Sequence, residues 1–186
     1  MSGSKVPAAM GALIFLCAGS EDLYNEIKET GLKAMGKASH YFGDVGFGTR
    51  AKLVVNSLMG TMMAAFGEAI ALSQTVGLDA GKMIDIIGLS AIQSPMFALK
   101  GPKMIAKDHD PNFPLKHAHK DMALASQLAK DAGVEYSVMN QAESLFRAAR
   151  TDEELNLSDL DFSAVFEKIH QESNGDFSKK RKADEI

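Results

Sequence analysis

A lysine and an asparagine four residues apart, Lys52 and Asn56, are the side chains of this sequence best placed to do chemistry together. Residues with this spacing lie on one face of an α-helix, so a single substrate could touch both. Gly46 and Gly48 mark the start of the helix, where free backbone N–H groups and the positive end of the helix dipole favour an anion. In that setting a lysine can give a proton to a carbonyl oxygen while the asparagine orients the substrate. The same pair is also common on exposed helices as a solvated pair without a function, and the spacing alone leaves that alternative open.

Composition narrows the class of protein without indicating a function. The 186 residues suffice for one sizeable core, or for one domain and part of another. With 46% hydrophobic and 24% charged residues and a net charge of -4, the chain gives no sign of binding nucleic acid. Its apolar runs are short or interrupted, so we expect no membrane span and no secretory signal. The single cysteine, Cys17, cannot form an internal disulfide, so we expect a cytoplasmic protein and leave an organellar or nuclear location open.

The first 45 residues have the pattern of an α/β layer. Residues 11–19 form a short apolar run between two glycines, which is typical of a strand buried on both faces. Ser20, followed by acidic residues, predicts the start of a helix that ends near Gly36, and residues 38–42 predict a second strand. Two strands are too few for a stable open sheet. We therefore expect residues 1–45 to be the remnant of a larger α/β domain.

After Gly46 the pattern changes to helices alone, separated by Gly, Pro and Asn. The predicted helices span residues 49–75, 79–87, 94–104, 114–132, 138–149 and 158–171. The predicted fold class is therefore mainly α, with an all-helical C-terminal domain over residues 46–172 preceded by the α/β remnant. Residues 173–186 are polar and include the basic run Lys179–Lys182, which predicts a disordered tail; a nuclear localisation or nucleic-acid patch is the alternative.

The surroundings of Lys52 resemble a segment of the β-hydroxyacid dehydrogenase family, to which the 3-hydroxyisobutyrate dehydrogenases belong. Residues 43–56 follow that family's pattern Gly-x-x-Gly-x-Gly-x-x-x-Lys-x-x-x-Asn. Residues 2–11 are similar to the family's substrate-binding segment, and residues 113–125 to its later helix with a Lys-Asp pair. Within the family, the sequence resembles the plant-type glyoxylate and succinic semialdehyde reductases most. This resemblance lies in residues 2–5, 94–97, 100–102 and 160–165.

The resemblance implies NADPH-dependent reduction of a small aldehyde acid, such as glyoxylate to glycolate or succinic semialdehyde to 4-hydroxybutyrate, with NADH as the alternative cofactor. Lys52 would be the catalytic residue that protonates or polarises the carbonyl oxygen while hydride passes to the carbonyl carbon. The resemblance also implies a Rossmann domain ahead of the helical domain, and a homodimer formed through the helical domain. The other site residues that it implies are Ser2, Gly3, Ser4, Asn56 and Asp121 for the substrate, and Gly48, Phe113 and Lys120 for the cofactor.

The sequence departs from the family because no Gly-x-Gly-x-x-Gly nucleotide-binding motif follows any predicted strand. That motif seats the cofactor pyrophosphate on a helix N-terminus, so without it we expect weak cofactor binding and no turnover by the isolated chain. The strand at residues 12–18 would also lack its sheet neighbours, which leaves edge groups unpaired. We expect the chain to be a fragment of a longer protein.

A metal site is not expected, because His117, His119 and Asp121 are two residues apart and would point in different directions from a helix. The eleven methionines are expected to fill gaps in the core. Two functional classes remain: the catalytic-lysine part of an oxidoreductase, or a non-catalytic helical dimerisation module derived from the same family. The sequence alone leaves open which aldehyde acid is reduced, and whether NADP or NAD is preferred.

Overall fold

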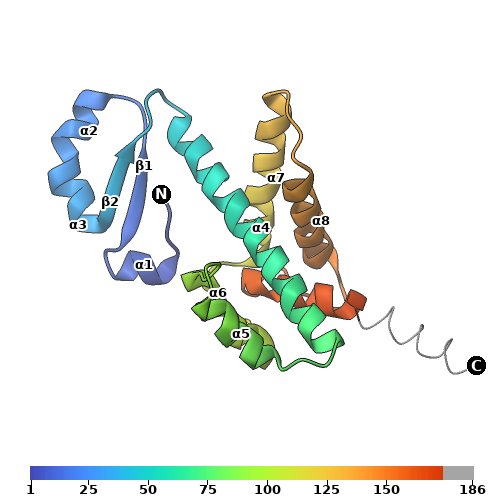
Figure 1. Ribbon diagram of the computed structural model, residues 1–186. Helices are drawn as coiled ribbons and strands as arrows, with labels where there is room; N and C mark the ends of the chain where they lie inside the picture. The colour runs from blue at the N-terminus through green and yellow to red at the C-terminus, as the bar shows by residue number, and fades with distance from the viewer. Residues whose placement is uncertain (174–186) are drawn as a thin grey trace, which may run out of the picture.

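The computed structural model describes residues 1–173 of the 186, so the predicted tail beyond residue 173 and its basic run lie outside the described residues. The described chain has two parts, a small sheet with short helices at the N-terminal end and a larger helical part (Figure 1). Most of these residues are helical, and their sheet has two strands. The predicted fold class, mainly α with a short α/β segment first, is therefore confirmed.

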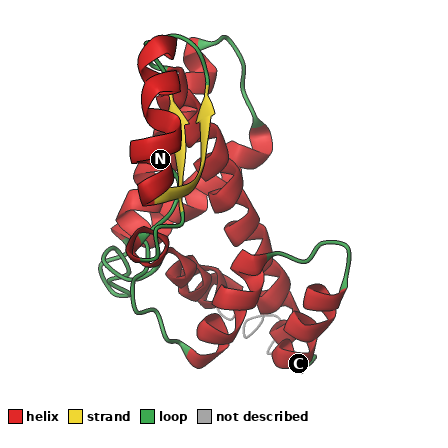
Figure 2. Ribbon diagram, turned by 90° about the vertical axis from the view of Figure 1, so that its left-hand side faces the viewer, coloured by secondary structure: helices red, strands yellow, loops and turns green. Residues whose placement is uncertain are grey.

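The sheet consists of two parallel strands, β1 (Leu13–Cys17) and β2 (Gly36–Tyr41). The connection between them runs along one side of the sheet (Figures 1 and 2) and comprises α2 (Glu21–Ile27), the π-helix η1 (Lys28–Leu32) and α3 (Lys33–Met35). Ser20 caps α2 by accepting a hydrogen bond from the backbone N–H of Leu23 at 3.2 Å. The predicted order of strand, helix and strand is confirmed. A short helix ahead of the sheet, α1 (Lys5–Ala9), is not among the predicted elements.

The larger part is arranged around α4, which crosses it diagonally with α7 and α8 alongside (Figure 1). Its helices are α4 (Phe47–Thr75), α5 (Ala80–Leu89), α6 (Pro95–Ala106), α7 (Leu115–Asp131), α8 (Ser137–Thr151), the 3-10 helix η2 (Phe162–Ala164) and a last helix over residues 165–173. Asp79 and Ser94 cap α5 and α6 by accepting hydrogen bonds from backbone N–H groups. Gly77, with a φ of 79°, provides the left-handed turn that follows α4.

The last predicted helix begins later than expected. Residues 158–160 form a turn, and Asp161 pairs with Pro114 in an isolated antiparallel bridge. The backbone N–H of Leu115 donates to the Leu160 carbonyl at 2.8 Å. The prediction of a helix from residue 158 is therefore wrong, because the backbone here pairs with the start of α7 instead of with its own next turn.

Small residues on α4 let neighbouring helices approach its backbone closely. A Cβ atom at Gly60 would lie 2.3 Å from the Sδ atom of Met122 on α7, and one at Gly67 would lie 3.0 Å from Ile169. Completely buried side chains include Met63, Ile70, Met104, Leu115, Met122, Phe146 and Val165. The interpretation of methionines as core residues is confirmed for Met63, Met104 and Met122, and it is wrong for Met10 and Met35, which are 75% and 52% exposed. By length and composition α4 could also cross a membrane, but the central helix of a helical core meets the same criteria.

The sheet and the helical part meet at Gly48 in the first turn of α4. Gly48 is buried, and a Cβ atom there would lie 2.3 Å from the carbonyl oxygen of Leu16 at the end of β1. Gly46, with a φ of 97°, provides the turn into the helix. Because the two backbones touch at this point, the sheet fixes the position of the first turns of α4, where Lys52 lies.

Candidate functional site

Lys52 and Asn56 lie on the part of α4 that adjoins α7. Asn56 is 3% exposed, and its Nδ2 atom donates a hydrogen bond to the Oδ2 atom of Asp121 on α7 at 2.5 Å. Lys52, one turn earlier on α4, is half-buried. The alternative of a solvated pair is therefore wrong for Asn56, which is held in the helix interface.

The buried carboxylate of Asp121 connects Asn56 to Lys120. Its Oδ2 atom accepts from Asn56, and its Oδ1 atom forms an ion pair with the Nζ atom of Lys120 at 2.7 Å. The Lys120 side chain is 57% exposed, so its charge faces the solvent beside Lys52 and Asp121. Four of the residues that the resemblance implies thus gather in one polar group, which we call the Lys52 cluster: Lys52, Asn56, Lys120 and Asp121.

The surroundings of Lys52 make its ammonium group easier to deprotonate. Burial lowers the pKa of Lys52 below its ordinary value, because the charged form loses solvation. The negative charge of Asp121 opposes this effect, and the positive charge of Lys120 adds to it. A lysine with a lowered pKa releases its proton more readily near neutral pH, which suits a general acid.

Removal of the Asp121 charge should move the pKa of Lys52 in a defined direction. In Asp121→Asn we expect the pKa of Lys52 to fall further, because the charge that stabilises the ammonium is lost. In Lys120→Gln we expect it to rise toward the ordinary value, because a repulsive charge is removed. NMR titration of isotope-labelled lysine side chains measures both shifts. A Lys52 pKa that stays constant or rises in Asp121→Asn would contradict the described electrostatics.

Ser2, Gly3 and Ser4 lie at the edge of the sheet. Ser2 pairs with Ile14 through two backbone hydrogen bonds of 2.8 and 2.9 Å. Gly3 has a φ of 126°, and a Cβ atom there would lie 2.7 Å from the side chain of Leu13. No hydrogen bond within residues 1–173 joins these three residues to the Lys52 cluster, so their role in binding a substrate carboxylate stays a prediction.

Gly48 lies one turn before Lys52 on α4, and Phe113 lies just ahead of α7. Gly48 packs on the end of β1. The Phe113 ring packs edge-on against Phe162 with ring centres 5.9 Å apart. Contact of either residue with a cofactor stays a prediction.

Of the two histidines of α7, His119 is buried and serves helix packing, whereas His117 is exposed. His119 lies between α7 and α8, where it contacts Glu143, whereas Asp121 faces α4. Within residues 1–173, no group of three or more His, Cys, Asp or Glu side chains is arranged to hold a metal ion.

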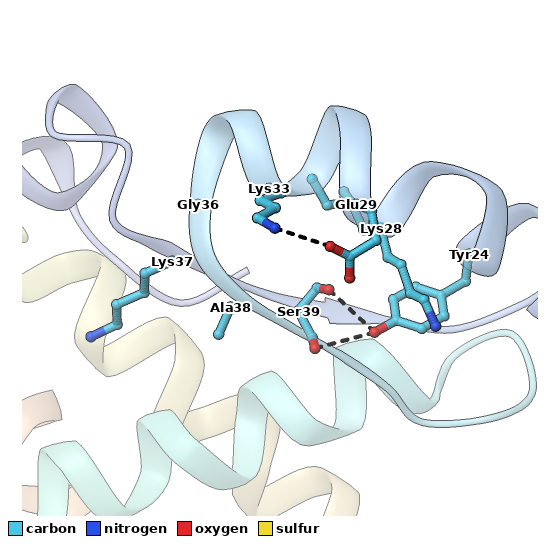
Figure 3. Close-up of a pocket in the computed structure, with 9 residues that line it drawn as sticks. Tyr24, Lys28, Glu29, Lys33, Gly36, Lys37, Ala38 and Ser39 are labelled. Carbon is cyan, nitrogen blue, oxygen red and sulfur yellow. Dashed lines mark hydrogen bonds and ion pairs between the residues drawn. The ribbon is translucent and has the colours of Figure 1, made fainter.

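A cavity of about 410 Å³ lies between β2 and the connection that precedes it (Figure 3). The Tyr24 hydroxyl donates a hydrogen bond to the Ser39 carbonyl at 3.2 Å, and Lys33 pairs with Glu29 at 3.1 Å. These polar groups satisfy one another, and no member of the Lys52 cluster lines the cavity. We therefore place the candidate active site at the Lys52 cluster and not at this cavity.

Sequence reasoning missed several buried polar groups, among them His109, whose Nε2 atom lies 3.0 Å from Glu167. His119 bonds to Glu143 and Arg150 on α8, and Lys100 on α6 pairs with Asp161. The partners of His119 and Lys100 are separated from them by 24, 31 and 61 residues, so no local spacing rule could have joined them. The sequence carries no signal that would have found them.

Comparisons with known proteins agree on one family. Residues 46–169 match a family model described as the NAD-binding part of NADP-dependent 3-hydroxyisobutyrate dehydrogenase. Glyoxylate/succinic semialdehyde reductase 2, chloroplastic, of Arabidopsis thaliana is 46% identical over 169 residues, which cover 91% of this chain and 46% of the relative. Glyoxylate/succinic semialdehyde reductase 1 of the same plant is 44% identical, with 91% of this chain and 57% of the relative covered. The chain thus spans about half the length of the curated relatives it matches.

A solved structure gives the same result for the fold. A 3-hydroxyisobutyrate dehydrogenase from Salmonella typhimurium superposes with a TM-score of 0.79 at 27% identity, and the match covers 89% of this chain and 57% of that chain.

Proposed function

The chain belongs to the NADP-dependent 3-hydroxyisobutyrate dehydrogenase family, and we propose that it supplies the proton-donating half of the active site of an NADPH-dependent reductase of small aldehyde acids. The observation that carries this proposal is the Lys52 cluster, in which a half-buried lysine of lowered pKa adjoins a fixed amide and carboxylate. Glyoxylate and succinic semialdehyde are the proposed substrates, because the curated relatives are named for them.

The proposed chemistry assigns tasks to three members of the Lys52 cluster. Lys52 donates a hydrogen bond, and then its proton, to the carbonyl oxygen as negative charge develops there. Asp121 is a positioning residue that holds Asn56 and balances the charge near Lys52. Lys120, which the resemblance implies for the cofactor, presents an exposed positive charge that attracts anionic groups of the bound molecules.

The Lys52 cluster provides a proton donor for the substrate carbonyl but not a binding site for the cofactor phosphates. NADPH, when bound, supplies the hydride that reduces the carbonyl carbon. The sequence contains no Gly-x-Gly-x-x-Gly turn to seat a pyrophosphate. We therefore propose that a nucleotide-binding part, in the same polypeptide or in another chain, completes the site.

A chimera tests this proposal. The chain is joined behind the part of Arabidopsis glyoxylate/succinic semialdehyde reductase 1 that precedes the matched segment, and NADPH oxidation is followed with glyoxylate and with succinic semialdehyde. We expect turnover by this completed reductase, and neither turnover nor tight NADPH binding by the isolated chain in calorimetric titration. Turnover by the isolated chain would show that it binds the cofactor phosphates without the glycine-rich motif. A folded but inactive chimera would overturn the proposed function.

A non-catalytic dimerisation module is the second candidate, and exposed apolar side chains favour it. Val54, Leu58 and Leu72 on α4 and Ile86 and Leu89 on α5 are all more than half exposed. Such side chains favour contact with another protein surface, and a second copy of the chain is the proposed partner. An inactive chimera combined with a dimer of the isolated chain in light scattering would favour this candidate.

A further inference from the structure

His119 is buried between α7 and α8 and bonds to α8 through both of its ring nitrogens. Its Nε2 atom lies 3.0 Å from the Oε1 atom of Glu143, and its Nδ1 atom lies 3.0 Å from the Nη1 atom of Arg150. In the part of the chain that the structure describes, these two are the hydrogen bonds that join side chains of α7 and α8. The buried residues of α8 are the apolar Ala142, Phe146 and Ala149.

The two partners determine which ring nitrogen of His119 donates and which accepts a hydrogen bond. A guanidinium group has hydrogen-bond donors and no acceptor, so the Nδ1 atom that faces Arg150 is the unprotonated acceptor. The ring proton is then on Nε2, where it donates to the Glu143 carboxylate. His119 is thus held through both ring nitrogens by two charged groups, and hydrogen bonds to charged groups are stronger than those between neutral ones.

His119 and Asp121 face opposite neighbours of α7. Successive helix residues are about 100° apart, so residues two apart point in directions that differ by about 200°. His119 accordingly contacts α8, while Asp121 contacts Asn56 on α4. The hydrophobic effect that packs α7 has no preferred direction. Hydrogen bonds on both sides of the helix do have a direction and oppose a rotation of α7.

We infer that His119 is a positioning residue for the Lys52 cluster: it holds α7 against α8 and thereby keeps the Asp121 carboxylate aimed at Asn56. When α7 turns, that carboxylate moves away from Asn56 and its charge acts less on Lys52. α8 contributes no residue that the family resemblance implies, yet it controls the geometry of the cluster. The inference about the position of Asp121 does not depend on enzymatic activity. Its consequence for catalysis rests on the proposed function.

NMR on the isolated chain tests the inference without any need for activity. The first measurement is the hydrogen exchange of the Asn56 side-chain amide, which its bond to Asp121 slows. The second is the titration of Lys52. In His119→Leu, which removes both hydrogen bonds to α8, we expect the Asn56 amide to exchange about tenfold faster. We also expect the pKa of Lys52 to fall, because Asp121 supports the ammonium less.

Three further variants keep the test decisive. Arg150→Met changes an exposed residue and removes only the donor to Nδ1, so it carries the test if His119→Leu fails to fold. It should change both measurements in the same directions as His119→Leu. His119→Gln, with an amide donor and a carbonyl acceptor, should restore them. Arg147→Met is the matched control, because Arg147 is an exposed α8 arginine that lies 3.9 Å from Glu143 and has no bond to His119.

The inference would be overturned if folded Arg150→Met had the same exchange rate of the Asn56 side-chain amide and the same Lys52 pKa as the wild type. Equal changes in Arg147→Met would also overturn it, since the effect would then not pass through His119. An error in the proposed function would be seen in a different experiment, as an inactive chimera. Both NMR measurements would remain valid in that case.

Discussion

Lys52→Met is expected to lower the turnover number of the completed reductase by about 100-fold to 10,000-fold, the range that a positioned proton donor contributes. Methionine keeps an unbranched stem in the half-buried site and removes the proton. The hydrogen bond between Asn56 and Asp121 does not involve Lys52, so the fold should persist. Because the lost interaction acts on the transition state, kcat and kcat/KM should fall together in steady-state assays of NADPH oxidation.

Lys130→Met is the matched control, because Lys130 is an exposed lysine in the last turn of α7 and should leave turnover unchanged. The pH dependence adds a second check. Lys52 must carry its proton to act as an acid, so turnover should fall as the pH rises through the pKa of Lys52. That pKa lies below the ordinary lysine value, and the fall should therefore begin at a lower pH than for an exposed lysine. Retained turnover in Lys52→Met would refute the proton-donor role.

Local signals predicted the helices well. Ser20, Asp79 and Ser94 each accept a hydrogen bond from the first turn of the helix that they precede, and this capping chemistry is readable from neighbouring residues. The turn at residues 158–160 could not be predicted in this way. Its backbone pairs with the start of α7, more than 40 residues earlier in the chain, and that partner leaves no mark on the local pattern.

For the candidate site, too, local spacing predicted only the residues that belong to one helix. Helical spacing alone placed Lys52 and Asn56 on one face, because both belong to α4. Only the family resemblance suggested Asp121 and Lys120 as their neighbours, since helix packing brings together residues 65 positions apart. His119 was considered for a metal site, and its contacts with Glu143 and Arg150 depend on how α8 packs against α7.

Among the single substitutions proposed for this chain, Lys100→Met is expected to lower the free energy of unfolding most. Lys100 is 3% exposed and Asp161 is fully buried, and the Nζ atom lies 2.8 Å from each carboxylate oxygen. The same carboxylate accepts backbone hydrogen bonds from Asn112, Phe113 and Ser163. Without Lys100 the carboxylate stays buried without a cation, so the free energy of unfolding should fall by about 3–5 kcal/mol in urea denaturation.

Two comparisons isolate the charge effect in Lys100→Met. Lys116→Met breaks an ion pair with Asp159 whose side chains are both partly exposed, and it should cost less than about 1 kcal/mol. The double variant Lys100→Met with Asp161→Asn should lose less stability than the sum of its single variants, because neither charge is then left alone. Equal losses in Lys100→Met and Lys116→Met would contradict a special cost for the buried charge.

The buried pair also predicts how stability depends on pH. Burial by itself would raise the pKa of Asp161, but Lys100 and the backbone donors outweigh it, so this pKa lies below its ordinary value. A carboxyl group of this kind stabilises the fold above its unfolded pKa of about 3.9, and the contribution is lost as the pH falls through the folded pKa. Lys100→Met raises the pKa of Asp161, so the gap in unfolding free energy between wild type and variant should narrow in acid. A gap that stays constant from neutral to acidic pH would show that the charge of Asp161 is not its source.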